Sequence, residues 1–225
     1  MRKRIAIYGG TFDPVHTGHL EIARQVSELF AIDQFLFVPA RKAPHKHDRE
    51  VTAPLHRHAM LVLATQADSR HCVSILELEG PERQYTVDTI AHFGRHFGED
   101  AELFFVMGAD SWLEISSWRE SQRLMTMANL IVVTRPGFEF SVEPGAEGSP
   151  TVIDVRGLKS AGEVPELEPA KPAIFVTDAV MIDVSATEIR EAVRDNRDED
   201  LNRLVPLEVA NYIRKYQLYR NTNEA

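Results

Sequence analysis

Residues 9–20 read GGTFDPVHTGHL, and they join two segments of different periodicity. The preceding residues 4–8 (RIAIY) are apolar enough to predict a β-strand. From Leu20 to Phe30, apolar residues recur at the spacing of one helix face. A strand that passes through a glycine-rich turn into a helix is the first unit of an α/β fold.

The turn has the features of an anion site. Asp13 suits a helix N-cap and Pro14 the first helical position, so we expect a helix from about Pro14. Its N–H groups and positive dipole end then face the space beside Gly9 and Gly10, whose backbone a ligand can approach closely. Phosphate is the usual occupant of such a site.

Two histidines of this stretch, His16 and His19, lie one helical turn apart and are expected to project to the same side, with Gly18 removing bulk between them. The dinucleotide fingerprint G-x-G-x-x-G and the P-loop Gly-Lys-Ser/Thr are both absent here. A pair of solvated polar side chains without a ligand remains an alternative interpretation. So does a zinc site, although no third ligand is evident.

Strands and amphipathic helices alternate along the chain, which predicts a Rossmann-like, doubly wound, mainly parallel sheet with helices on both faces. Strands are expected at residues 4–8, 34–38, 72–78, 102–107, 129–133, 151–155, 173–176 and 180–184. Helices are expected at residues 14–30, 54–67, 86–96, 119–126, 187–194 and 206–216. We interpret residues 1–225 as one domain, with 138–172 an irregular insertion and 186–225 a C-terminal helical extension.

Composition narrows the classes of function. The 225 residues, 44% of them hydrophobic, suffice for one sizeable core. A net charge of −9 argues against a general nucleic-acid or membrane-surface binder. The only cysteine, Cys72, excludes an intramolecular disulfide and is expected to be a buried, inert thiol. No apolar run reaches the roughly 20 residues of a membrane span, and the run after MRKR is too short for a signal peptide, so we expect a cytoplasmic protein.

A second element late in the chain, S-A-T-E-I-R at residues 185–190, complements H-T-G-H at residues 16–19. Together they resemble the two-part signature, H-x-G-H and S-x-T-x-x-R, of the nucleotidylyltransferase superfamily. The chemistry is consistent with that, because Ser185 suits a helix N-cap and Arg190 offers a forked cation to a triphosphate. Ser185 and Glu188 would equally form an ordinary capping box.

Within the superfamily, the chain resembles the bacterial nicotinate-nucleotide adenylyltransferases over nearly its whole length. The further matching pieces are APHK (43–46), HR (56–57), QYT (84–86), GAD (108–110), Trp118, RPG (135–137) and the ending VPLEVANYIRKYQLY (205–219). The sequence departs from the family pattern at Ala43, where a proline is frequent, and at Ala186, where many relatives have serine.

The resemblance implies transfer of AMP from ATP to nicotinate mononucleotide. The products are nicotinate adenine dinucleotide (deamido-NAD) and pyrophosphate, and the reaction is a step of NAD biosynthesis. It implies direct in-line attack without a covalent enzyme intermediate, with Mg²⁺ accompanying ATP and no metal ligand from protein side chains. The expected partners are the two substrates, without nucleic acid or membrane. A homo-oligomer is compatible with the sequence.

The resemblance also implies roles for particular residues, with His16, His19 and Arg190 as the catalytic ones. The implied ATP-binding residues are Gly9, Gly10, Thr11, His16, Gly18, His19, Ser185, Thr187 and Arg190. The implied mononucleotide-binding residues are Thr11, His45, Lys46, Tyr85, Thr86, Gly108, Asp110 and Trp118. Plainer interpretations stay open for some: a solvated charge run around Lys46, an N-cap at Thr86, a turn cap at Asp110, and a core position at Trp118, although Trp112 fits the core better.

Three other functions compete with this interpretation. Phosphopantetheine is a disfavoured acceptor because of the chain length and the pieces around Tyr85 and Trp118. Nicotinamide mononucleotide stays open as an acceptor, since discrimination between an acid and its amide rests on backbone donors. A non-catalytic nucleotide-binding regulator would be expected to have lost His19 or Arg190, and both are present.

Overall fold

The computed structural model describes residues 2–41, 51–80, 85–134, 150–165, 171–178 and 184–220. Within them lies one seven-stranded sheet, in which every pairing is parallel and the strand order is β3-β2-β1-β4-β5-β7-β6. The strands are β1 (Lys3–Gly10), β2 (Gln34–Pro39), β3 (His71–Val73), β4 (Ala101–Gly108), β5 (Asn129–Val133), β6 (Thr151–Asp154) and β7 (Ala173–Thr177). The predicted Rossmann-like α/β fold is therefore confirmed.

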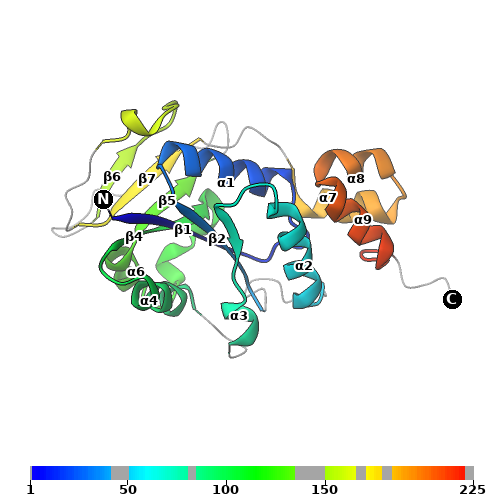
Figure 1. The fold of residues 1–225 in the computed structure, drawn as a ribbon, viewed down its shortest axis with the longest axis horizontal. Helices are drawn as coiled ribbons and strands as arrows, with labels where there is room; N and C mark the ends of the chain where they lie inside the picture. The colour runs from blue at the N-terminus through cyan, green and yellow to red at the C-terminus, as the bar shows by residue number, and fades with distance from the viewer. Residues whose placement is uncertain are drawn as a thin grey trace.

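Helices cover both faces of this sheet. They are α1 (Thr17–Leu29), α2 (Pro54–Thr65), α3 (Leu76–Glu79), α4 (Thr86–Phe97), α5 (Ala109–Leu113), α6 (Ser121–Met127), α7 (Ala186–Arg194), α8 (Asp198–Leu204) and α9 (Leu207–Lys215), with 3₁₀ turns at Ile115–Ser117 and Ala161–Glu163. In Figure 1, α1 lies on one face and α4 and α6 on the other, while α7, α8 and α9 gather at one end of the sheet beside α2. None of the described helices combines the length and the apolar character needed to cross a membrane.

The core has two layers because the sheet is buried on both sides. In β1, Ala6 and Tyr8 pack into the cluster shared with α1, α2, α7, α8 and α9, whereas Ile5 and Ile7 pack into the cluster shared with α4, α5 and α6. Burial on both faces explains why the strands are continuous apolar runs instead of alternating ones. It also fixes the sheet rigidly beneath the loops at its carboxyl edge.

The predicted start of the first helix is wrong. Helix α1 begins at Thr17 with His16 as its N-cap residue, not at Pro14 with Asp13 as the cap. The reason is that the Asp13 carboxylate is engaged elsewhere, accepting a hydrogen bond of 2.9 Å from the Tyr219 hydroxyl. Phe12, at φ 49°, turns the chain in the left-handed region before the helix starts.

The expected strand at residues 72–78 is only half present. β3 ends at Val73, and a short helix, α3, follows from Leu76. The Ser74 amide makes the last bond to β2, donating to the Phe37 carbonyl at 2.8 Å. The Ser74 side chain then accepts from the Leu76 amide at 3.2 Å, so the hydroxyl starts a turn that ends the strand.

Other differences are small. The short helices α5 and α8 were not predicted, since each presents too few apolar residues for a periodic signal. The short strand in the 138–172 insertion is confirmed as β6, which forms an edge of the sheet beside β7. Most of the expected strand at 180–184 lies outside the described residues. Cys72 is half-buried in β3, not fully buried as expected.

Candidate active site

The strand order itself defines a crevice. From β1 the chain moves outward to β2 and β3, then crosses back to β4 on the other side of β1. In open parallel sheets, ligands bind at such a reversal point, outside the carboxyl ends of the strands. Gly9 and Gly10 end β1, and Gly108 ends the neighbouring β4. Two of the predicted site segments therefore meet at the position where the fold favours a ligand.

The turn after β1 is tightly built. A Cβ atom on Gly10 would lie 2.9 Å from Cζ of Phe12, which is closer than van der Waals contact allows. Phe12 in turn packs edge-on against the His19 ring, with 4.9 Å between ring centroids. A side chain at position 10 would therefore displace the Phe12 ring, which packs against a predicted catalytic histidine.

The two histidines do project to the same side, as predicted. Their rings stack with centroids 3.6 Å apart and planes 28° apart. The His16 amide donates to Nδ1 of His19 at 3.2 Å, at the positive end of the α1 dipole. Because a backbone N–H is always a donor, Nδ1 of His19 acts as the acceptor. The neutral ring therefore carries its proton on Nε2.

Gly18 lets the late sequence element approach α1. A Cβ atom at this position would come within 2.7 Å of Cγ1 of Val184 and 3.2 Å of Nδ1 of His16. Val184 directly precedes Ser185, the N-cap residue of α7. The missing side chain thus brings the start of α7 against the start of α1.

Arg190 joins the two halves of the predicted signature. It is only 9% exposed, and its Nη1 donates to the Asp13 carbonyl at 2.7 Å, across 177 sequence positions. Its Nη2 donates to Oγ1 of Thr187 at 2.9 Å. Ser185 is the N-cap of α7 and accepts from the Glu188 amide at 3.2 Å, so the predicted N-cap is confirmed.

The described residues of the predicted mononucleotide site come from several elements. Thr11 lies in the turn after β1, Gly108 ends β4, and Asp110 lies on α5. Tyr85 and Thr86 lie at the start of α4, and Trp118 follows the 3₁₀ turn at 115–117.

Tyr85 is the N-cap residue of α4 and Thr86 the first helical residue, so Thr86 is not the cap. The Arg119 guanidinium lies 4.7 Å from the centroid of the Tyr85 ring, a cation–π contact between the start of α4 and the residue after Trp118. The Trp118 ring packs edge-on against the Phe105 ring, with 6.2 Å between the ring centroids. The buried Nε1–H of Trp118 has no acceptor among the described residues.

Two expectations about the predicted mononucleotide residues need refinement. Trp112 and Trp118 are both partly buried against the same core cluster, so burial does not separate them. Asp110 is exposed in the first turn of α5, whose N-cap residue is Gly108, so Asp110 is not the cap. His45 and Lys46 lie outside the described residues.

Arg57 lies behind the turn that follows β1, and the sequence assigned it no role. It is 0% exposed, and it donates to the carbonyls of Thr11 (2.6 Å), Ala40 (2.7 Å), Arg41 (3.2 Å) and Thr52 (2.8 Å). Burial lowers the pKa of its guanidinium, and the charge of Asp13 opposes that effect. The sequence signal that could have pointed to Arg57 is its helical spacing of three and four residues from Met60 and Leu61, which puts it on the buried face of α2.

The donors at the crevice suit phosphate better than a metal ion. They are imidazole, guanidinium and amide N–H groups, which complement anionic oxygens. Among the residues that the structure describes, no three His, Cys, Asp or Glu side chains gather into a metal-binding group.

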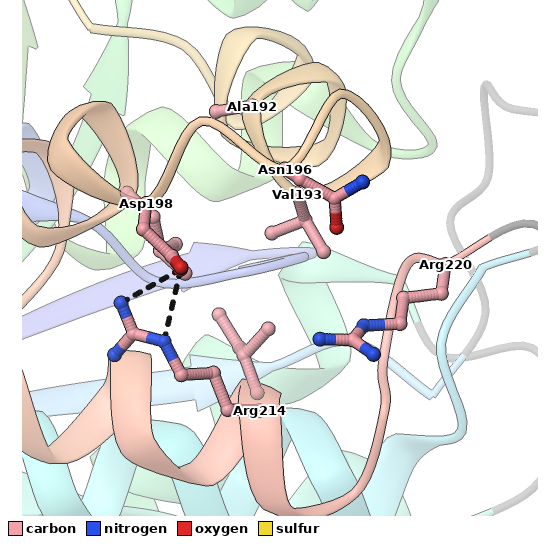
Figure 2. A pocket seen from close by; sticks show the side chains of 8 residues that line it. Ala192, Val193, Asn196, Asp198, Arg214 and Arg220 are labelled. Atoms are coloured by element: carbon pink, nitrogen blue, oxygen red, sulfur yellow. Dashed lines mark hydrogen bonds and ion pairs between the residues drawn. The ribbon is translucent and has the colours of Figure 1, made fainter.

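A small hollow among α7, α8, α9 and Arg220 is separate from this crevice. Figure 2 shows Arg214 bonded to Asp198 at its rim, and the two nitrogen–oxygen distances are 3.0 Å. The hollow has about 20 Å³ of space, enough for one water molecule. It is far too small for a nucleotide and contains none of the predicted site residues.

Comparisons with known proteins identify the family of this chain. The cytidylyltransferase-like family model matches residues 7–192, so the chain is a nucleotidyltransferase of that family. A relative from Thermoanaerobacter sp. (strain X514) is 38% identical over 98% of this chain and 96% of its own length. One from Thermus thermophilus is 37% identical over 96% of this chain and 100% of its own. Both carry the name "Probable nicotinate-nucleotide adenylyltransferase". The chain belongs to the nicotinate-nucleotide adenylyltransferases.

Solved structures share the fold. The Plasmodium falciparum nicotinic acid mononucleotide adenylyltransferase complexed with NaAD superposes with a TM-score of 0.70, at 22% identity, over 96% of this chain and 97% of the other.

Proposed function

We propose that this protein transfers AMP from ATP to nicotinate mononucleotide, forming nicotinate adenine dinucleotide and pyrophosphate. The observation that supports it best is the Arg190–Asp13 bond, because it joins both halves of the phosphate signature beside the stacked histidines. At that point the described protein groups offer donors and positive charge to a polyphosphate.

On the ATP side, His19 would donate from Nε2 to the α-phosphate, where negative charge grows in the transition state. His16, Thr11 and the backbone of Gly9, Gly10 and Gly18 would line the path of the phosphates. Ser185, Thr187 and Arg190 would hold the β- and γ-phosphates, with Arg190 the strongest single donor.

On the mononucleotide side, Trp118 would stack on the pyridine ring, and the amides at Tyr85 and Thr86 would receive the carboxylate at the start of α4. The remaining contacts would come from Gly108 and Asp110 to ribose hydroxyls, and from Thr11, His45 and Lys46 to phosphate.

In the proposed reaction, a phosphate oxygen of the mononucleotide attacks the α-phosphorus of ATP directly. The bond from that phosphorus to the oxygen bridging to the β-phosphate breaks, and pyrophosphate leaves with the electron pair. Catalysis is then positioning and charge stabilisation, without a covalent enzyme intermediate. Mg²⁺ would enter with ATP, as the metal–nucleotide complex that is the substrate.

The test is pyrophosphate release from ATP and Mg²⁺, with nicotinate mononucleotide, nicotinamide mononucleotide and phosphopantetheine compared as acceptors. We expect a strong preference for the nicotinate acceptor. Preference for another acceptor would overturn the substrate assignment, and release with none, from protein that binds ATP, would favour a regulator.

The steric course of the reaction tests the mechanism separately. With the phosphorothioate of ATP that is chiral at the α-phosphorus, a single displacement inverts the configuration. Retention would require a second displacement and therefore a covalent intermediate.

A further inference from the structure

The turn at residues 11–13 is held from behind by side chains of three distant elements. Arg57 of α2 donates to the Thr11 carbonyl at 2.6 Å, and Arg190 of α7 donates to the Asp13 carbonyl at 2.7 Å. The Tyr219 hydroxyl, from the segment after α9, donates to Oδ1 of Asp13 at 2.9 Å. The turn therefore has buried bonds to the middle and to the end of the chain.

The Asp13 carboxylate is an unusual anchor for a turn because it is buried. The residue is only 2% exposed, and its Oδ2 also accepts from the Thr52 amide at 3.5 Å. Burial of a carboxylate is costly unless charged or polar partners compensate it. The guanidinium of Arg57 supplies attraction between opposite charges there.

The segment that carries Tyr219 is itself held in an unfavourable conformation. Tyr219 has a φ of 66°, in the left-handed region that residues with a side chain seldom adopt. Gln217, at φ 52°, instead belongs to an ordinary helix end, because the Leu218 amide donates to the Ile213 carbonyl at 3.0 Å across it. Phe12, within the turn, has φ 49°. Strain of this kind persists only where surrounding contacts fix the conformation, and it concentrates at functional sites.

We propose that Tyr219 is a positioning residue for the transfer reaction, acting through the Asp13 carboxylate to fix the turn that leads into His16. This inference rests on the proposed function for its kinetic consequence. Burial, with the nearby charge of Asp13, raises the pKa of Tyr219, so its hydroxyl remains a donor throughout the ordinary pH range. Without that bond, the turn loses a restraint on the side away from the substrates.

A loosened turn should affect the transition state more than substrate binding. The reacting groups tolerate little misalignment, whereas ground-state contacts made elsewhere still bind both substrates. We therefore expect Tyr219→Phe to lower kcat about tenfold and to leave both KM values within about twofold.

The matched control is Tyr216→Phe. Tyr216 lies three residues earlier and is 48% exposed, and its ring packs on His56 and Tyr212. Kinetics of the full chain should be measured for both variants, together with hydrogen–deuterium exchange of the peptide covering residues 9–17. Faster exchange in Tyr219→Phe, with no change in Tyr216→Phe, is the expected result. In an Asp13→Ala background, Tyr219→Phe should have no further effect on kcat.

Three results would overturn the proposal. One is unchanged kcat and unchanged exchange in Tyr219→Phe. Another is a Tyr219→Phe variant that loses activity only because its melting temperature is lower, and that regains full activity when it is assayed at a lower temperature. The third is an equal effect of the Tyr216 control. If the wild-type protein makes no nicotinate adenine dinucleotide, the proposed function fails, and the exchange comparison alone then decides whether Tyr219 fixes the turn.

Discussion

At the scale of single residues, a backbone N–H group determines which nitrogen of the His19 ring carries the proton. The His16 amide can only donate, so its bond to Nδ1 of His19 leaves Nε2–H as the outward donor of the neutral ring. The stack with His16 and the edge contact with Phe12 hold that ring on both sides. A fixed donor of this kind stabilises charge that develops in a transition state without reorganisation of the site.

The donor at Nε2 can be tested by amide substitutions. His19→Ala should lower kcat by roughly 10²–10³, while the melting temperature stays close to that of the wild type. His19→Gln should retain more activity than His19→Asn, because only the longer amide places an N–H near the position of Nε2. Steady-state pyrophosphate release measures this, and unchanged turnover in His19→Ala would remove the catalytic role.

Two glycines make a matched pair for a second prediction. Gly18→Ala should lower both kcat and stability, because its Cβ would meet Val184 at 2.7 Å and press on the His16 ring at 3.2 Å. In Gly94→Ala, inside α4, the added Cβ would lie 3.9 Å from its nearest neighbour, Cδ1 of Leu103, which is an ordinary contact. This variant should be more stable than the wild type by about 0.5–1 kcal/mol. Calorimetry and the kinetic assay on both variants check the contrast. A harmless Gly18→Ala would show that α1 and α7 are not closely packed.

The tryptophans allow a similar comparison for the mononucleotide. Trp118→Ala should raise KM for nicotinate mononucleotide by roughly tenfold or more, the range expected for loss of a stacked ring, with KM for ATP little changed. Trp112→Ala removes an indole from the same core cluster and should lower the melting temperature without that KM effect. A defect confined to ATP would contradict the stacking role of Trp118.

At the scale of elements, the sequence predicted most strands and helices but not always where they end. Buried runs such as β4 and β5 are recognisable because both faces of the sheet are covered. The start of α1 and the end of β3 were misjudged, because the deciding bonds come from Tyr219 and from a serine hydroxyl. Local sequence does not reveal that the Asp13 carboxylate accepts a hydrogen bond from a tyrosine 206 residues away instead of capping the helix that follows it.

The junction of α3 with α4 gives a prediction on pH. Glu77 in α3 accepts a hydrogen bond of 2.7 Å from the Thr89 hydroxyl of α4, and burial raises its pKa above the ordinary 4.5. A raised pKa means that the folded state binds the proton more tightly. The stabilisation from Glu77 is therefore fully present below pH 4.5 and is lost as the pH rises through the folded-state value.

Glu77→Gln keeps an acceptor for Thr89 and removes the partly buried charge. Its melting temperature should exceed that of the wild type at about pH 8, and the difference should shrink toward about pH 4. The control is Glu79→Gln, an exposed residue of the same helix, which should show no such trend. A Glu77→Gln difference that is constant with pH would show that the carboxyl does not titrate in this range.

At the scale of the whole molecule, sequence order predicted that strands and helices would alternate, but not which distant residues would meet. The resemblance to a family indicated the two elements of the proposed phosphate site, and the bond from Arg190 to the Asp13 carbonyl brings them together after β1. The buried bonds of Arg57 and Tyr219 escaped prediction because their partners are main-chain carbonyls and a carboxylate far along the chain. Such contacts depend on the assembled tertiary structure.

The same assembly predicts that residues 1–225 unfold as one unit. The cluster on the α1 face includes residues from β1 to Ile213 of α9, and it shares the sheet with the cluster on the α4 face. Trp112 and Trp118 both lie against the second cluster. Tryptophan fluorescence therefore reports on one face, while far-ultraviolet circular dichroism reports on the helices of both, and the two urea transitions should coincide.

A core substitution on the opposite face makes this test sharper. Ile213→Ala, at a residue 1% exposed, should lower the free energy of unfolding by about 2–5 kcal/mol. If the chain is a single domain, the fluorescence midpoint must fall as far as the dichroism midpoint, although both tryptophans are on the other side of the sheet. A dichroism transition that moves alone would mean that α7, α8 and α9 unfold as a separate unit, because the tryptophan environment would then survive their loss.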